Sequence, residues 1–217
     1  MKTFTVIPVI IAIVLILASQ FASADNGKFI EAMRKQIDAV YKAQTIDEFR
    51  AAVNGFERIG AAEKNKWEPY YYSAFGYIMM ATREQDNGRK DSYLDEAMKA
   101  IEAGEKLAPQ ESELAALKGF AYMMRVTVDP GARGPQFAPL SMQNYEKALK
   151  LNPENPRAYA LLAQMQYGTT QFFGSSTTEA CETLNKSIEK FDSYKSENPL
   201  APQWGRGMAD EMKGNCK

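Results

Sequence analysis

Apolar residues recur at steps of three and four along most of the chain, which is the period of an amphipathic helix. The pattern begins with Phe29, Met33 and Ile37 on one helical face, and it continues, with breaks, into the C-terminal region. No segment shows sustained alternation of apolar and polar residues, so we expect no strands. The sequence therefore predicts an all-α fold.

Local signals place the helix ends. Thr45-x-x-Glu48 and Ser176-x-x-Glu179 have the pattern of a capping box, and Asn155 before Pro156 is typical of a helix start. Three stretches rich in glycine, proline or charge are predicted to be loops, with Ser92 capping the helix after the first and helix returning at Ser141 after the second. The three are residues 83–91 (REQDNGRKD), 128–139 (VDPGARGPQFAP) and 168–176 (GTTQFFGSS).

The first residues have the features of an export signal. A short positive start precedes an apolar run, and Ala22-Ser23-Ala24 is a pattern that signal peptidase cleaves. An uncleaved membrane anchor is the alternative, but this run is shorter than the roughly 20 apolar residues that span a bilayer. We expect cleavage after Ala24, a periplasmic or secreted location, no membrane span after cleavage, and a single domain over residues 25–217.

Composition removes several classes of function. The chain has no histidine, which excludes Ser-His-Asp and Cys-His catalysis. A net charge of −1 without a basic run gives no sign of nucleic-acid binding. Neither a metal-ligand spacing nor a phosphate loop is recognisable. We therefore predict that the protein is not an enzyme, with no catalytic, metal or cofactor site. A carboxylate cluster of Glu84, Asp86 and Asp91 in the first loop is the weaker alternative.

Small residues recur at long, regular intervals. Ala52, Ala97, Ser141 and Ala180 are 45, 44 and 39 residues apart, whereas a tetratricopeptide (TPR) repeat has about 34. The best-defined unit has Gly119 three residues before Tyr122, followed by Tyr145, Ala148 and Pro153. This pattern resembles the TPR repeat, and the extra residues fall between the two helices of each unit.

The resemblance implies a right-handed solenoid of antiparallel helix pairs with enlarged turns inside the repeats. The units cover about residues 28–64, 67–109, 112–153 and 156–195, and a capping helix covers 202–214. The whole chain resembles small exported bacterial TPR proteins with no assigned activity. The implied function is a scaffold that binds a protein or peptide. A structural or self-associating spacer is one alternative, and an enzyme with its site in the inserts is another.

The resemblance also implies where a partner would bind. The first helix of each TPR unit lines a concave groove, which is either open to a partner or filled by the inserts or the N-terminal helix. The inserts should gather along one rim of the stack, although their phenylalanines could instead fold inward. The groove positions are Tyr71, Phe75, Met79, Phe120, Met123, Met124, Gln164 and Tyr167, and the rim positions are Arg83, Arg133, Phe137, Phe172 and Phe173.

The two cysteines, Cys181 and Cys216, are either a disulfide or two separate thiols. An even number in an exported chain favours the disulfide. The TPR resemblance implies that the helix opening near Thr177 packs antiparallel to the last helix, which places the two cysteines close together. We therefore predict a Cys181–Cys216 bridge.

Overall fold

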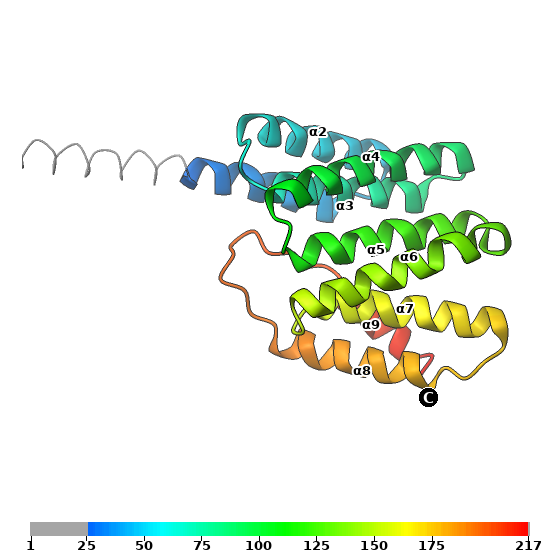
Figure 1. Cartoon of the computed structure of the whole chain (residues 1–217). Helices are drawn as coiled ribbons and strands as arrows, with labels where there is room; N and C mark the ends of the chain where they lie inside the picture. Colours follow the sequence, from blue (N-terminus) through cyan, green and yellow to red (C-terminus); the bar gives the residue numbers. More distant parts are fainter. Residues whose placement is uncertain (1–25, 217) are drawn as a thin grey trace, which may run out of the picture.

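The computed structural model describes residues 26–216, so the predicted signal peptide lies outside the described residues. Within that range the chain forms nine helices (Figure 1). The first covers residues 26–42, and the others are α2 (Ile46–Ala62), α3 (Glu68–Arg83), α4 (Asn87–Leu107), α5 (Ser112–Val128), α6 (Pro130–Leu151), α7 (Pro156–Phe173), α8 (Thr178–Ser193) and α9 (Arg206–Lys213).

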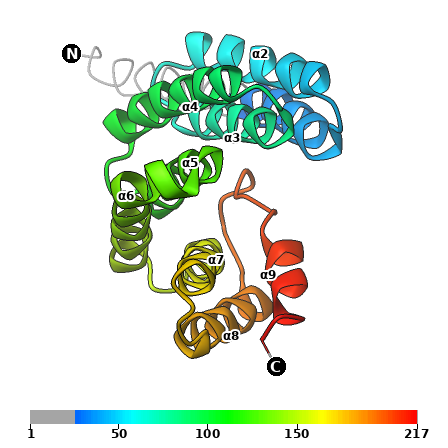
Figure 2. The same cartoon turned by 90° about the vertical axis from the view of Figure 1, so that its right-hand side faces the viewer.

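Consecutive helices pack in pairs, and the closest pairs are α3 with α4, α5 with α6 and α7 with α8. The pairs stack into a curved array, with α2 to α4 at one end and α7 with α8 at the other (Figure 2). The all-α prediction and the pairwise packing are confirmed. The curvature gives the molecule a concave side, which α3, α5 and α7 face.

The small residues of the repeat allow the two helices of a pair to come close. A Cβ atom at Gly119 would overlap the buried ring of Tyr145 and lie 3.0 Å from the carbonyl oxygen of Ser141. The Ser141 hydroxyl donates a hydrogen bond of 2.8 Å to the carbonyl of Gly119. Glycine and serine at these positions therefore let α5 and α6 meet backbone to backbone.

The first two inserts are mostly helical, which corrects the prediction of loops. Asp86 accepts a hydrogen bond of 2.8 Å from the backbone N–H of Arg89, so α4 begins at Asn87 and Ser92 lies inside it rather than capping it. Asp129 caps α6 in the same way through the N–H of Ala132 at 3.0 Å. An aspartate cap and the packing of neighbouring helices outweigh the poor helix propensity of glycine and proline here.

The third insert is also largely helical, because α7 continues to Phe173 and ends at Gly174 with a φ of 66°. The capping box predicted at Ser176 does not form. Thr177 is the N-cap of α8 and makes no side-chain cap, while the Ser176 hydroxyl accepts from the N–H of Thr178 at 3.3 Å. The extra residues of all three units therefore lengthen helices rather than loops.

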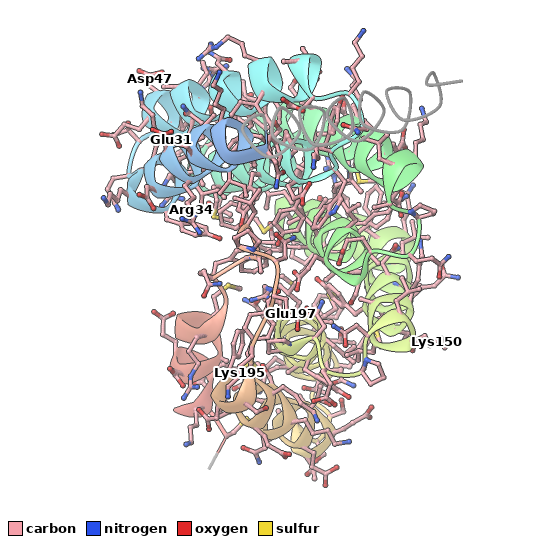
Figure 3. The ribbon with its side chains drawn as sticks, turned by 90° about the vertical axis from the view of Figure 1, so that its left-hand side faces the viewer. Glu31, Arg34, Asp47, Lys150, Lys195 and Glu197 are labelled. Atoms are coloured by element: carbon pink, nitrogen blue, oxygen red, sulfur yellow. A yellow bond between two sulfur atoms is a disulfide. The ribbon has the colours of Figure 1, made fainter. Side chains whose placement is uncertain are left out.

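A crossover segment, residues 194–205, connects α8 to α9 across the concave side (Figure 2). Lys195 and Glu197 are labelled on it in Figure 3. The Tyr72 hydroxyl donates to the carbonyl of Leu200 at 2.7 Å, and the N–H of Gln203 donates to the Tyr41 hydroxyl at 3.0 Å. Because these anchors come from two helices near the start of the chain, the crossover segment ties the C-terminal region to the N-terminal repeats.

The Cys181–Cys216 disulfide is confirmed, with a distance of 5.5 Å between the two Cα atoms. It joins the first turn of α8 to the end of the chain just after α9. Gly205, the N-cap of α9, has a φ of 102°, a conformation that favours glycine. The glycine turns the chain into α9, and the disulfide holds that helix against α8.

Candidate functional site

A groove of about 1590 Å³ opens on the concave side, bounded by α3, α5, α6, α7 and α9. Its lining is predominantly apolar, and among the described residues that line it only Glu146 is charged. Proline, glycine and threonine residues from the second and third inserts complete the walls. The most distinctive feature is a set of six methionines: Met79, Met123, Met124, Met142, Met165 and Met208.

Helical spacing explains why these side chains share one surface. On α5, Phe120, Met123 and Met124 are three and four residues apart and lie on one face. On α6 the lining includes Pro135 and Ala138 in the helical insert, so this insert forms a wall of the groove. Methionine is flexible and polarisable, which suits a surface that adapts to its ligand.

The predicted groove residues divide into two groups. Met79, Phe120, Met123, Met124 and Gln164 line the open groove, whereas Tyr71, Phe75 and Tyr167 do not. The sequence leaves open whether the groove is free for a partner or is filled by the inserts or the N-terminal helix. The structure shows it filled at one end by the crossover segment and by Tyr41 of the N-terminal helix, whose ring centre lies 6.0 Å from that of Phe75.

Trp204 is the residue of the crossover segment that occupies this end of the groove. Its ring centre lies 5.1 Å from that of Phe75 and 5.9 Å from that of Phe120. Its indole N–H donates to the Tyr71 hydroxyl at 2.9 Å. Tyr71 and Phe75 are therefore buried, and the free part of the groove lies beyond Phe120 toward the inserts.

A buried ion pair contacts the crossover segment. Arg157, 1 % exposed, makes hydrogen bonds of 2.7 to 3.0 Å to both carboxylate oxygens of Glu113. It also donates to the carbonyl of Trp204 at 3.4 Å and lies 4.6 Å from the centre of the Tyr194 ring. Burial lowers the pKa of Arg157, but the charge of Glu113 outweighs it and the pKa lies above its usual value. No local pattern in the sequence indicates this pair.

The predicted rim residues also divide. Phe172 and Phe173 line the groove and are 61 % and 75 % exposed. Phe137 is half-buried, stacked on Tyr122 with ring centres 6.2 Å apart. Arg83 lies outside the groove lining and donates to the carbonyl of Gln44 at 3.1 Å. The third insert therefore reaches the groove through its phenylalanines.

Arg133 and the insert carboxylates have structural partners. Arg133 makes two hydrogen bonds of 2.7 Å to Asp91, which hold the pKa of that carboxyl below its usual value. Hydrogen bonds from Arg89 and nearby backbone N–H groups hold the pKa of Glu84 at about 2. The groove lining includes none of Arg83, Asp86 and Arg133, which the enzyme alternative would bring together in one pocket.

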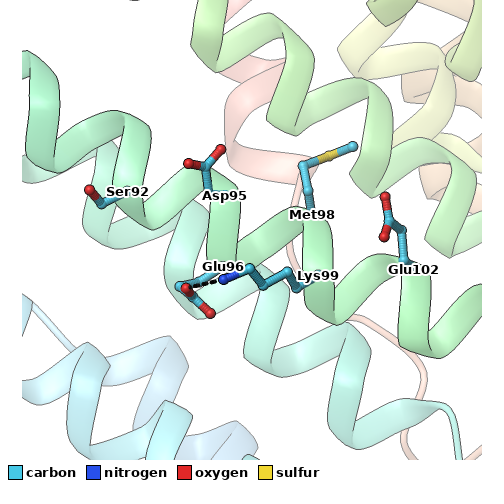
Figure 4. A pocket seen from close by; sticks show the side chains of 6 residues that line it. All are labelled: Ser92, Asp95, Glu96, Met98, Lys99 and Glu102. Carbon is cyan, nitrogen blue, oxygen red and sulfur yellow. Dashed lines mark hydrogen bonds and ion pairs between the residues drawn. The ribbon is translucent and has the colours of Figure 1, made fainter.

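A second, smaller depression of about 390 Å³ lies on the outer face of α4 (Figure 4). All of its lining residues come from this one helix, and Lys99 pairs with Glu96 at 2.7 Å. Asp95 is paired with Arg125 of α5. A shallow polar surface on a single helix, with Asp95, Glu96 and Lys99 already paired, is a weak candidate for a binding site.

Within residues 26–216, no helix has the length and hydropathy to cross a membrane. No group of three or more histidine, cysteine, aspartate or glutamate side chains in this range is arranged to hold a metal ion. The groove is therefore the main candidate site.

The structure is similar to two solved proteins. The HusA haemophore from Porphyromonas gingivalis shares 29% identity with a TM-score of 0.78, over 87% of this chain and 92% of that one. A thermophilic TPR protein from Thermus thermophilus shares 16% identity with a TM-score of 0.54, over 85% and 91%. No family model and no curated protein matches the sequence. The chain has a TPR-like fold, which confirms the resemblance read from its repeat.

Proposed function

We propose that this protein binds haem, or a ligand of similar size with a planar apolar ring, in the groove. The observation that carries the proposal is the methionine-rich groove in a chain that is structurally similar to a haemophore over most of its length. A rigid helical array with a concave apolar site needs no catalytic step for this role. A concave, largely apolar groove of this size supports the binding of a small molecule.

The lining also suggests how haem would lie. Haem has an apolar ring and two carboxylates, and Glu146 is the one charged residue among the described residues of the lining. The apolar edge would therefore enter first and leave the carboxylates in solvent, because burial of an unpaired charge is costly. The lining contains no histidine, cysteine or tyrosine, so methionine sulfur is the iron ligand that it offers. Apolar contact with the ring would supply most of the affinity.

Binding of a protein or peptide is the second candidate, and the TPR-like fold favours it. The crossover segment works against an extended peptide, because Trp204 already covers Tyr71 and Phe75 where such a peptide would lie. An apolar segment that enters only the free part of the groove fits better. It would compete with haem for the same side chains.

A haem titration tests the proposal. We expect saturable binding, seen as a change in haem absorbance and as quenching of tryptophan fluorescence, since Trp204 lies against Phe120 in the lining. Met124→Glu should weaken binding by tenfold or more, roughly 1.4 kcal/mol, because it places a charge beside the apolar ring. The matched control is Leu107→Glu, which adds the same charge to an exposed leucine outside the groove lining.

Two results would contradict the haem proposal. Unsaturable haem uptake would indicate non-specific adsorption, and equal weakening by Met124→Glu and Leu107→Glu would place the ligand outside the groove. If haem fails to bind and an apolar peptide binds in a manner sensitive to Met124→Glu, the second candidate replaces the first. Circular dichroism of each variant checks that the helices remain folded.

We propose further that the protein acts outside the cytoplasm. Disulfides form and persist in oxidising compartments, and the chain has the Cys181–Cys216 bridge. Similarity to a haemophore supports the same location. We expect the exported protein to begin at Asp25, and N-terminal sequencing of protein recovered outside the cytoplasm checks this. A chain that still begins at Met1 would argue for an uncleaved anchor.

A further inference from the structure

The C-terminal end of α7 consists of residues 168–173. It ends in Phe172 and Phe173, which are the two most exposed large apolar side chains in the described part of the chain. Their rings contact each other edge to face, with centres 5.1 Å apart. Both rings also belong to the lining of the groove. An exposed apolar pair at the edge of a site indicates contact with a ligand or partner.

A glycine lies on either side of the pair. Gly168 lies inside α7, where glycine weakens a helix relative to alanine. A Cβ atom at this position would meet no atom within 4 Å, so close packing does not explain the glycine. Gly174 ends the helix in the left-handed conformation, with a φ of 66°. The turn that carries the two rings therefore has a glycine at each end.

We propose that residues 168–174 form a clamp that pivots at Gly168 and closes Phe172 and Phe173 over an aromatic ligand in the groove. This inference rests on the proposed function and adds to it a means of holding the ligand. Closure buries two rings that are otherwise in water, and an aromatic ligand offers a flat face on which they pack. The side chains of the open groove hold the ligand on its other face.

The clamp makes two predictions for haem binding. Phe172→Ala with Phe173→Ala should weaken haem affinity about tenfold or more, with most of the change in a faster dissociation rate. Binding of haem to the unaltered protein should slow hydrogen exchange at the backbone amides of residues 168–176. A merely structural role would not produce this ligand-dependent protection.

The pivot has a matched pair of variants. Gly168→Ala stiffens the helix at the proposed pivot, and we expect it to speed haem dissociation several-fold while leaving thermal stability unchanged or higher. Gly27→Ala adds the same methyl group to a helical glycine outside the groove lining, also with no atom within 4 Å, and should leave dissociation unchanged. Equal changes in the haem dissociation rate in the two variants would show that Gly168 is not a pivot.

The outcomes separate the clamp from the proposed function. If the unaltered protein binds no haem, both the proposed function and the clamp are wrong. If it binds haem, but the double alanine variant keeps the same affinity and exchange at residues 168–176 is unaffected, the clamp alone is wrong. If haem affinity is unchanged and the double variant loses binding to a partner protein instead, the two rings are a docking site and the clamp is again overturned.

Discussion

Arg157→Met should lower the free energy of unfolding by about 3–5 kcal/mol, because it leaves the carboxylate of Glu113 buried without a counter-charge. The two side chains are almost fully buried and share three hydrogen bonds of 2.7 to 3.0 Å. The arginine also holds the carbonyl of Trp204, so its loss loosens the crossover segment. Loss of the arginine therefore also weakens the contact that the crossover segment makes with the N-terminal repeats.

Denaturant unfolding followed by circular dichroism measures this change. Arg206→Met is the control, since Arg206 pairs with Asp192 and Asp210 on the surface, where solvent screens the pairs, and its loss should change the free energy of unfolding far less. The double variant Arg157→Met with Glu113→Leu should recover part of the loss, because no unpaired charge remains. If Arg157→Met destabilises no more than Arg206→Met, the buried pair does not have the role assigned to it.

Removal of the disulfide is the second large effect that we expect. Cys181→Ser with Cys216→Ser should lower the free energy of unfolding by about 4 kcal/mol, since the bridge closes a loop with a sequence separation of 35. It should also weaken ligand binding, because α9 has eight residues and carries Met208 of the groove lining. Without the bridge, this short helix is held by the packing of Ala209 and Met212 and by the ion pair of Arg206 with Asp192.

Chemical denaturation with and without a reducing agent provides the measurement. The reductant should destabilise the unaltered protein by the same amount as the double serine variant, and it should not affect that variant. A haem titration of the reduced protein reports whether α9 contributes to the site. Unchanged stability after complete reduction would show that packing alone fixes the C-terminal region.

Much of the helical framework could be predicted from residue patterns, because they are local. The capping box at Thr45 forms as expected, with hydrogen bonds from the Glu48 N–H to the threonine hydroxyl and from the Thr45 N–H to the glutamate. Gly119, Ser141 and Tyr145 lie at the close contact of α5 with α6 that their spacing predicted. The cysteine pairing also follows once the last two helices are taken as antiparallel.

The inserts show where local signals fail. Glycine and proline in residues 128–139 predict a loop, yet α6 begins at Pro130 and includes Pro135 and Pro139. Proline at the first helical position and the Asp129 cap favour the helix locally, and packing against α5 supplies the rest. Helix propensity correctly identifies glycine and proline as poor helix formers. It does not include the tertiary contacts that stabilise the helix here.

The candidate site was predicted in part. Five of the eight predicted groove residues line the open groove, since the first helix of each repeat faces the concave side. Tyr71 and Phe75 do not, because Trp204, more than 125 positions later in the sequence, covers them. The groove wall formed by the start of α6 was not predicted, because residues 128–139 were expected to be a loop rather than a helix.

The sequence by itself determined the helices, the repeat and the apolar character of the first helix in each unit, because these follow from spacing within a few turns of chain. Only the tertiary structure decided which part of the groove is open. That outcome depends on the path of residues 194–205 and on the buried pair of Arg157 and Glu113, whose partners are far apart in sequence. Contacts of this kind have no local pattern, since they join residues that are between 44 and 162 positions apart in the sequence.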